Sequence, residues 1–303
     1  MEPIGGYFGF EGMQAELPVP GVLLNSGRNA MRWILKELGI RKVHIPFYTC
    51  PVVEQAVREE GCTVVHYPLE KDFLPAVDFP VDEWVVYNNY FGVCGEKVAT
   101  LAKRHRNLIV DNAQAFYSPP PGCAAFYSPR KFFGLPDGGI AVIPGLEKTV
   151  VNLEPDHSVG RLAHLFRRLE DGPEAGYAEF HEAERQLDGA PIHAMSATTR
   201  ALLGCCDFQG AAVRRRANFA FLHERLHSSF PFALSEDDVP MAYPYVSQDP
   251  TLREKLIAQR IFVPLYWPQI APSACPVDGI LPLPIDQRYG EEDMEQIVEN
   301  IFG

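Results

Sequence analysis

The 303-residue sequence lacks several features that define large classes of protein. Its 27 basic residues against 39 acidic ones give a net charge of −12, so it has no basic surplus with which to neutralise the phosphates of a nucleic acid. No apolar run approaches the roughly 20 residues that a membrane helix requires. Met1–Gly6 has neither the basic region nor the apolar core of a secretion signal. We therefore expect a cytoplasmic protein with no nucleic-acid partner and no membrane partner.

The cysteines and histidines show no metal-binding or redox pattern. The seven cysteines cannot all pair with one another and contain no C-x-x-C, so neither a zinc ribbon nor a thioredoxin motif is present. The histidines between residues 157 and 227 are too scattered for a metal site. We expect reduced thiols that pack as small apolar side chains, and no bound metal.

The first half of the chain alternates helical and strand patterns, which implies right-handed crossovers and a mostly parallel sheet with helices on both faces. Ligands of such sheets bind beyond the carboxyl ends of the strands. The residues that follow each strand are therefore the candidates for a functional site. The expected strands are 42–46, 63–67, 83–88, 107–111, 124–128 and 139–143, and the expected helices are 31–38, 52–60 and 96–106.

The second half is organised differently, and we place a domain change near residues 196–210. We expect a large domain over 1–200, which includes an N-terminal arm, and a smaller C-terminal domain over 201–303. The sequence shows no internal repeat. The elements expected here are a helix over 196–226 with a break near Gly204, short strands over 242–246 and 262–265, and a final helix over 291–301.

Two clusters suit an anionic or flat ligand. The helix start at residues 26–29 exposes backbone N–H groups at the positive end of the helix dipole, and Arg28 adds a charge. The simpler interpretation of this cluster is a helix N-cap. Tyr48 stands on the turn after the strand 42–46, where an aromatic ring either stacks on a ligand or packs in the core.

Two further clusters offer an acid and an amine. Asp111 directly follows an apolar strand, where burial and a cationic partner decide its ionisation, unless it only caps a helix. Lys131 comes 20 residues later, between aromatic residues and glycines, and apolar neighbours disfavour the charged form of a lysine. A Schiff-base nucleophile requires a lysine with a lowered pKa, whereas the alternative is a solvated surface lysine. Together the four clusters contain the parts of a pyridoxal phosphate site.

The order of these motifs resembles the DegT/DnrJ/EryC1/StrS family of sugar aminotransferases, within the fold-type I, aspartate aminotransferase-like pyridoxal phosphate enzymes. The similarity touches most of the chain and is strongest from residue 21 to residue 143. The matching segments are Gly27–Ala30 for a Gly-Thr-x-Ala phosphate turn, Asp111–Gln114 for Asp-x-Ala-His/Gln, Lys131 followed by Pro136–Gly139 for a lysine followed by Gly-Glu-Gly-Gly, and Arg215–Asn218 for Arg-Arg-x-Asn.

The resemblance implies a fold and an activity. The fold is a three-layer α/β large domain with a mixed, mostly parallel sheet, followed by a smaller C-terminal α+β domain. The activity is the transfer of an amino group from an amino acid such as glutamate to a nucleotide-linked keto-sugar, in surface polysaccharide or secondary-metabolite biosynthesis. The family's sites are built at a dimer interface, so the resemblance also implies a homodimer.

The resemblance assigns roles to individual residues. Lys131 would bind the cofactor covalently and move a proton, and Asp111 would pair with the pyridinium nitrogen. The other implied contacts are Tyr48 stacked on the ring, Gln114 near the 3′ oxygen, Ser26, Gly27, Arg28 and Asn29 at the phosphate, Ser128 as a second phosphate ligand, and Asn89 and His193 on the substrate side.

The sequence also departs from the family pattern, mainly at the substrate end. It is shorter than typical members, Asn89 replaces a histidine, and only Met195-Ser196 echoes the segment that enters the neighbouring subunit's site. Two other functions therefore stay open. One is different pyridoxal phosphate chemistry (a dehydratase, racemase or lyase), against which the retained Lys131 weighs. The other is a non-catalytic relative that binds a ligand or a partner.

Overall fold

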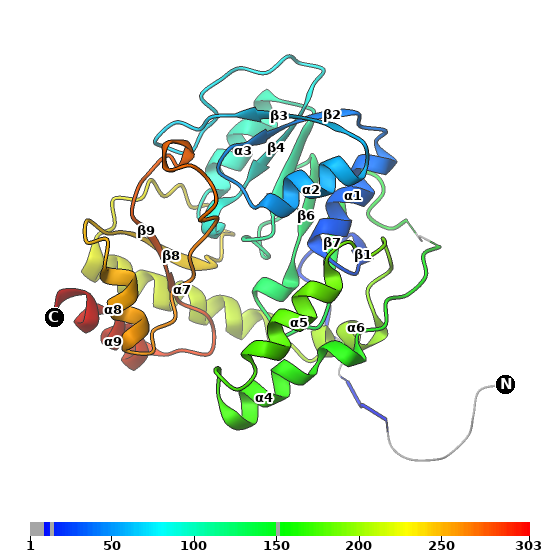
Figure 1. Cartoon of the computed structure of the whole chain (residues 1–303). Helices are drawn as coiled ribbons and strands as arrows, with labels where there is room; N and C mark the ends of the chain where they lie inside the picture. Colours follow the sequence, from blue (N-terminus) through cyan, green and yellow to red (C-terminus); the bar gives the residue numbers. More distant parts are fainter. Residues whose placement is uncertain (1–8, 13–14, 150–151) are drawn as a thin grey trace.

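A seven-stranded sheet forms the centre of the computed structural model, which describes residues 9–12, 15–149 and 152–303. Its strand order is β1-β7-β6-β5-β4-β2-β3; β2 to β6 run parallel, and β7 is antiparallel to both of its neighbours (Figure 1). This sheet confirms the expected α/β class. The strands are β1 (Val22–Leu24), β2 (Lys42–Pro46), β3 (Thr63–Tyr67), β4 (Trp84–Asn88), β5 (Leu108–Asn112), β6 (Ala124–Tyr127) and β7 (Gly139–Val142).

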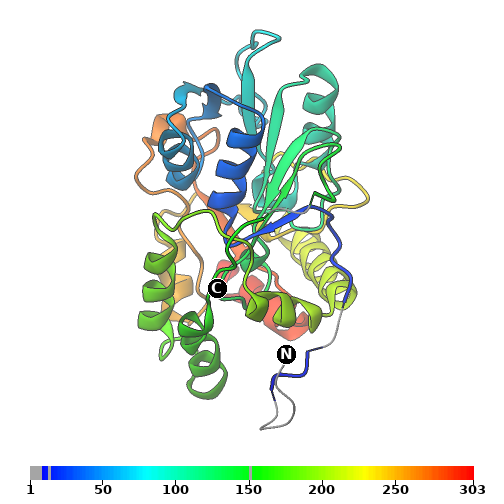
Figure 2. The same ribbon diagram turned by 90° about the vertical axis from the view of Figure 1, so that its right-hand side faces the viewer.

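Helices cover both faces of the sheet, because alternate strand residues are apolar on each side. On one face, α1 (Gly27–Glu37) and α2 (Pro51–Glu59) pack Trp33 and Val57 against Val86 and Ile109. On the other face, α3 (Gly95–Arg104) and the C-terminal part of the chain pack against Tyr87 and other strand residues. Figure 2 shows the sheet nearly edge-on between these layers. The three-layer arrangement is therefore confirmed.

The C-terminal part carries its own two-stranded antiparallel sheet, β8–β9. Side chains of this part, among them Leu283 and Met294, belong to the same apolar cluster as Tyr87 of β4 and Phe91, which follows β4. The division into 1–200 and 201–303 stays a prediction, and Met1–Phe8 of the expected arm lies outside the described residues. The elements here are α7 (Phe208–Leu226), β8 (Ala242–Val246), α8 (Leu252–Ala258), β9 (Ile280–Pro284) and α9 (Glu291–Phe302).

The helix expected over 196–226 is interrupted where the sequence indicates, at Gly204. It forms α6 (Ala197–Gly204) and α7, and each begins at a side-chain cap. Ser196 Oγ accepts a hydrogen bond from the Thr199 amide, and Asp207 accepts one from the Gly210 amide. Two separate caps make two helices.

Some elements differ from the expectation. Residues 262–265 form no strand in the described part of the chain; Phe262 and Leu265 are about half exposed, and Pro264 lacks the N–H that a ladder needs. The sequence patterns did not predict β1, β9, α8 or the helix pair α4 (Ala163–Asp171) and α5 (Tyr177–Leu187). No helix among the described residues is long and apolar enough to cross a membrane.

Candidate active site

Asp111 lies at the carboxyl end of β5, on the face that α1 and α2 cover, because it follows Ile109 by two residues. Only 7% of it is exposed, and its Oδ1 accepts a 2.8 Å hydrogen bond from the Ala113 amide. Its Oδ2 has no hydrogen-bond partner among the described residues. Burial raises the pKa of Asp111, while the Lys131 ammonium and the Ala113 amide oppose that shift. The carboxyl group is thus suited to pair with a cation.

Lys131 ends the short 3-10 turn Pro129–Lys131 that follows β6. Its side chain is exposed, and its ammonium group makes no ion pair or hydrogen bond with the described part of the protein. The neighbouring Phe132 is buried in the core, under the guanidinium of Arg215. The aromatic flank therefore anchors this turn beneath the lysine and leaves the amine accessible.

The start of α1 lies against Ser128, which follows β6. A Cβ atom on Gly27 would come within 3.3 Å of the Ser128 Cβ and 3.6 Å of its Oγ, so the two segments nearly touch. Ser128 is buried, and its hydroxyl has no hydrogen-bond partner among the described residues. Ser26 caps the helix by accepting a 3.1 Å hydrogen bond from the Asn29 amide. A helix start beside an unused hydroxyl is a suitable anion site.

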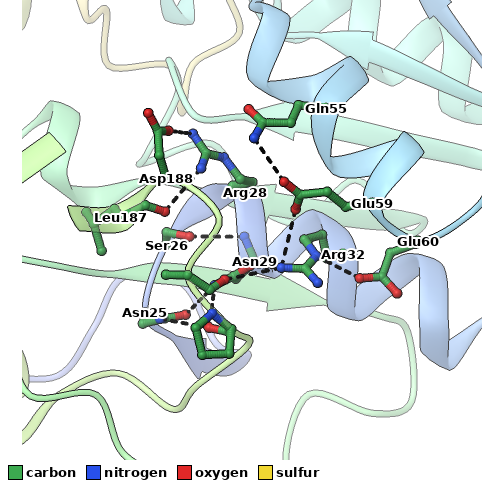
Figure 3. Close-up of polar contacts among 12 residues, drawn as sticks. Asn25, Ser26, Arg28, Asn29, Arg32, Gln55, Glu59, Glu60, Leu187 and Asp188 are labelled. Atoms are coloured by element: carbon green, nitrogen blue, oxygen red, sulfur yellow. Dashed lines mark hydrogen bonds and ion pairs between the residues drawn. The ribbon is translucent and has the colours of Figure 1, made fainter. Parts of the chain in front are cut away.

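Arg28 extends from this helix start toward the end of α5 (Figure 3). Its guanidinium forms an ion pair with Asp188 and donates a 3.1 Å hydrogen bond to the Leu187 carbonyl. Its Nε is buried and has no hydrogen-bond partner among the residues that the structure describes. Arg28 thus sits beside the anion site with one unused donor, and Asp188 offsets part of its charge.

Asn29 has partners within the chain that account for its side chain. Its amide donates 2.8 Å hydrogen bonds to Asn25 Oδ1 and to the Pro191 carbonyl, and its Oδ1 accepts one of 3.0 Å from Arg32 (Figure 3). These contacts fasten the 190–191 segment to α1. The structure therefore gives Asn29 a bracing role.

Tyr48 lies in the apolar cluster on the opposite face of the sheet from Asp111. Its ring is stacked on Tyr90 with the centroids 5.9 Å apart, and it meets Trp267 edge-on at 4.7 Å. Burial raises the pKa of the Tyr48 hydroxyl. Of the two interpretations of this ring, the structure favours core packing.

Gln114 supports a strained turn after β4. Its Oε1 accepts a 2.6 Å hydrogen bond from the Phe91 amide, and Phe91 has a left-handed backbone with φ of 55°. The next residue, Gly92, could not carry a Cβ, which would lie 2.7 Å from the Gln114 carbonyl oxygen. The Gln114 side chain is therefore used at least in part to hold this turn.

Solved structures with this arrangement of elements include sugar aminotransferases. A DegT DnrJ EryC1 StrS aminotransferase from Brucella abortus matches with a TM-score of 0.57 and 16% identity, over 93% of this chain and 85% of that chain. The sugar aminotransferase CalS13 from Micromonospora echinospora matches with a TM-score of 0.55 and 14% identity, over 92% and 86%. Spr1654 from Streptococcus pneumoniae, in its PLP-form, has a TM-score of 0.61 and 14% identity, over 92% and 85%.

The chain shares the fold of these solved aminotransferases. Searches of protein-family models and of curated proteins found no match.

The two residues predicted on the substrate side occupy different settings in this aminotransferase fold. Asn89 is 1% exposed; its amide donates 3.2 Å hydrogen bonds to Asn112 Oδ1 and Ser118 Oγ, and its Oδ1 accepts one of 3.1 Å from the Cys94 amide. Its polar atoms are thus engaged inside the protein. His193 is partly exposed, and its backbone exchanges hydrogen bonds with Asn25 at the end of β1.

Asn88, rather than Asn89, is the neighbour of Asp111. The two residues are paired in register across β4 and β5, so their side chains project from the same face. Asn88 donates a 2.8 Å hydrogen bond to Thr49, and its Oδ1 is buried without a partner. Sequence reasoning missed this residue, although its position at the end of the apolar strand 83–88 was a usable signal.

Arg215 connects the C-terminal part of the aminotransferase fold to the lysine turn. It is 2% exposed, lies 4.5 Å above the Phe132 ring, and donates a 3.0 Å hydrogen bond to the Met241 carbonyl. Burial lowers the pKa of Arg215 to about 10. The Arg215 guanidinium therefore serves packing and backbone contacts within the protein.

Proposed function

We propose that this chain is a pyridoxal phosphate-dependent aminotransferase. One observation carries the proposal: a buried acid, an accessible amine and an anion site lie together at the carboxyl ends of the adjacent parallel strands β5 and β6. Spr1654, which has the same fold, is described in PLP and PMP forms. The edge of the sheet where these groups lie is where α/β folds bind ligands.

The residues present fit this cofactor. Its phosphate needs donors, which Ser128, the start of α1 and the unused Nε of Arg28 would supply. Its ring nitrogen needs an acid, which the free oxygen of Asp111 would supply. When bound, the cofactor provides an electron sink for the carbon that bears the amino group.

The protein's own groups would then have distinct tasks. Lys131 Nζ would attach the cofactor covalently and, once the amino donor had displaced it, would carry a proton to and from the reacting carbon. Asp111 would stay ionised beside the positive ring nitrogen, because a cation there opposes the effect of burial. Contacts of Tyr48, Gln114 and Asn29 with the cofactor stay predictions, since each has partners in the core.

For the substrates we propose a nucleotide-linked keto-sugar as acceptor and an amino acid such as glutamate as donor. The sequence motifs support this choice, and so does the fold shared with CalS13, which is described as a sugar aminotransferase. A role in surface polysaccharide or secondary-metabolite biosynthesis, action as a homodimer, and a cytoplasmic location belong to the same proposal.

The test is an absorbance spectrum of the purified protein with and without glutamate. We expect a cofactor band in the visible range that disappears when glutamate converts the cofactor to its amine form. Borohydride should trap a covalent adduct in the wild type and in the control Lys103→Ala, but not in Lys131→Ala.

The other outcomes separate the alternatives. A bound cofactor that no amino acid converts to its amine form would point to dehydratase, racemase or lyase chemistry. If the protein takes up no pyridoxal phosphate at micromolar concentration, the remaining interpretation is a non-catalytic relative. Either result would overturn the aminotransferase proposal.

A further inference from the structure

A cleft of about 790 Å³ separates the α4–α5 helix pair from the C-terminal elements α8 and α9. Figure 1 shows α4 and α5 at the bottom of the molecule, with α8 and α9 beside them. Pockets for small ligands have volumes of about 300–1,000 Å³. The described residues that line the cleft include neither Asp111 nor Lys131. The cleft is therefore lined by a different set of residues from the candidate active site.

The charge of the cleft is opposite to that of the whole protein. Four arginines line it, against only Glu174 and Asp293, in a chain with a net charge of −12. Burial, followed by repulsion from Arg130, lowers the pKa of the lining His164. The positive charge of the cleft therefore comes from its arginines.

Two of the four arginines are not neutralised within the described residues. Arg260 pairs with Glu174 at 2.9 Å, and Arg288 pairs with Asp286 at 2.7 Å. Asp293 accepts a hydrogen bond from the Gly290 amide as a helix cap. Arg168 and Arg253 have no carboxylate partner in the part of the chain that the structure describes.

Arg253 is held in place on its wall of the cleft. Its Nε donates a 2.9 Å hydrogen bond to the Val263 carbonyl, which leaves its terminal nitrogens for another acceptor. Arg168 stands on α4, across the cleft from α8. The two walls thus each offer a guanidinium group.

The walls between these arginines are apolar and partly aromatic. Phe180 of α5 is 40% exposed and Phe262 is 48% exposed, and both line the cleft. The wall is also rigid at its base, because Gly176 packs so closely on α4 that a Cβ would lie 2.8 Å from the His164 carbonyl oxygen. Aromatic surface beside a fixed cation suits a ligand with a flat body and an acidic group.

We propose that this cleft binds a small organic anion, with a carboxylate or phosphate group at Arg168 and Arg253 and an aromatic or branched apolar body between Phe180 and Phe262. The site does not depend on the cofactor. It is also distinct from the anion site at the start of α1, whose residues do not line it.

The test uses 8-anilinonaphthalene-1-sulfonate as the probe, titrated into the intact protein with fluorescence detection. We expect saturable binding of one dye per chain. Arg168→Gln and Arg253→Gln should each weaken it about tenfold, since each removes one charge-assisted contact. Arg104→Gln, on α3 and outside the cleft, makes the same charge change and should have no effect. Phe262→Ser should weaken binding, while Phe302→Ser should not.

Three results would overturn the proposal. One is dye binding that is absent or does not saturate, or that Arg104→Gln weakens as much as Arg168→Gln and Arg253→Gln do. Another is that pyridoxal phosphate displaces the dye from the wild type but not from Lys131→Ala, because the dye would then occupy the cofactor site. The third is loss of dye binding as sedimentation shows dimers forming, because a second copy would then cover the cleft. Circular dichroism of each variant confirms that it is folded.

Discussion

Asp111 shows how one residue can serve the proposed chemistry at the expense of stability. A carboxyl group that is 7% exposed, and that keeps one oxygen without a hydrogen bond, is a costly group to ionise in the folded protein. The folded state therefore holds its proton more tightly than the unfolded state does, as the raised pKa indicates. The hydrogen bond that it accepts from the Ala113 amide needs only an oxygen atom, which an asparagine also has, whereas a cationic ring would need the acid.

We predict from this that Asp111→Asn stabilises the cofactor-free protein. Because the folded-state pKa is raised, the stability linked to this group is present at low pH and is lost as the pH rises through that pKa. Asp111→Asn has no such pH-dependent loss of stability. It should therefore unfold at higher urea concentration than wild type at pH 7, with a smaller difference near pH 4. It should also retain less pyridoxal phosphate. Asp82→Asn, at an exposed position, is the control; equal effects of both substitutions would contradict the prediction.

At the same scale, the sequence predicts the position of a residue best where that position follows from the order of the strands along the chain. Asp111 lies at the end of β5, Ser128 directly follows β6, and Lys131 ends the turn after Ser128, so a correct strand assignment places all three at one edge of the sheet. Tyr48 and Asn89 also follow strands, but a shift of one residue along a strand exchanges the two faces. Which face a side chain takes depends on the register between strands, and no local pattern specifies that.

Among the elements, the helix pair α4–α5 is the main one that sequence patterns did not predict. Its large apolar residues point outward: Phe166 is 55% exposed and Leu169 is 80% exposed. The apolar residues of α4 nevertheless recur at helical spacing, so its amphipathic pattern was a usable signal that sequence reasoning missed. The buried strands β4 and β5 were predicted well, because both of their faces are covered and their residues are apolar up to the polar ones at their carboxyl ends.

Gly176 is the residue on which this helix pair depends, and Gly176→Ala tests that. The added Cβ would meet the His164 carbonyl at 2.8 Å, which is backbone and cannot turn aside. We expect a loss of about 1–3 kcal/mol in the free energy of unfolding, as for other overpacked sites, and faster proteolysis within α4–α5. Gly160→Ala is the matched control, because a Cβ there has no atom within 4 Å. A stability loss of the same size in both variants would show that close packing is not the cause.

For the whole molecule, the apolar core decides how the two expected domains unfold. One cluster of buried residues runs from Tyr87 and Phe91, beside the sheet, to Leu283 and Met294 in the C-terminal part. Arg215 adds polar contacts across the same boundary. A division near residue 200 therefore separates two parts of the chain that share a core.

We predict a single cooperative unfolding transition in urea, in spite of that division. Parts that share a buried core lose their contacts together, whereas independently folded domains unfold in separate steps. Trp33 lies in α1, Trp84 in β4 and Trp267 in the C-terminal part, so Trp267→Phe leaves fluorescence probes only in the part that holds the large sheet, and the double variant Trp33→Phe/Trp84→Phe leaves only Trp267. Far-ultraviolet circular dichroism follows the loss of helix in the same two variants. In each variant the fluorescence midpoint should coincide with the circular dichroism midpoint. A fragment of residues 201–303 should accordingly be unfolded on its own, and a folded fragment or two separate midpoints would contradict the shared core.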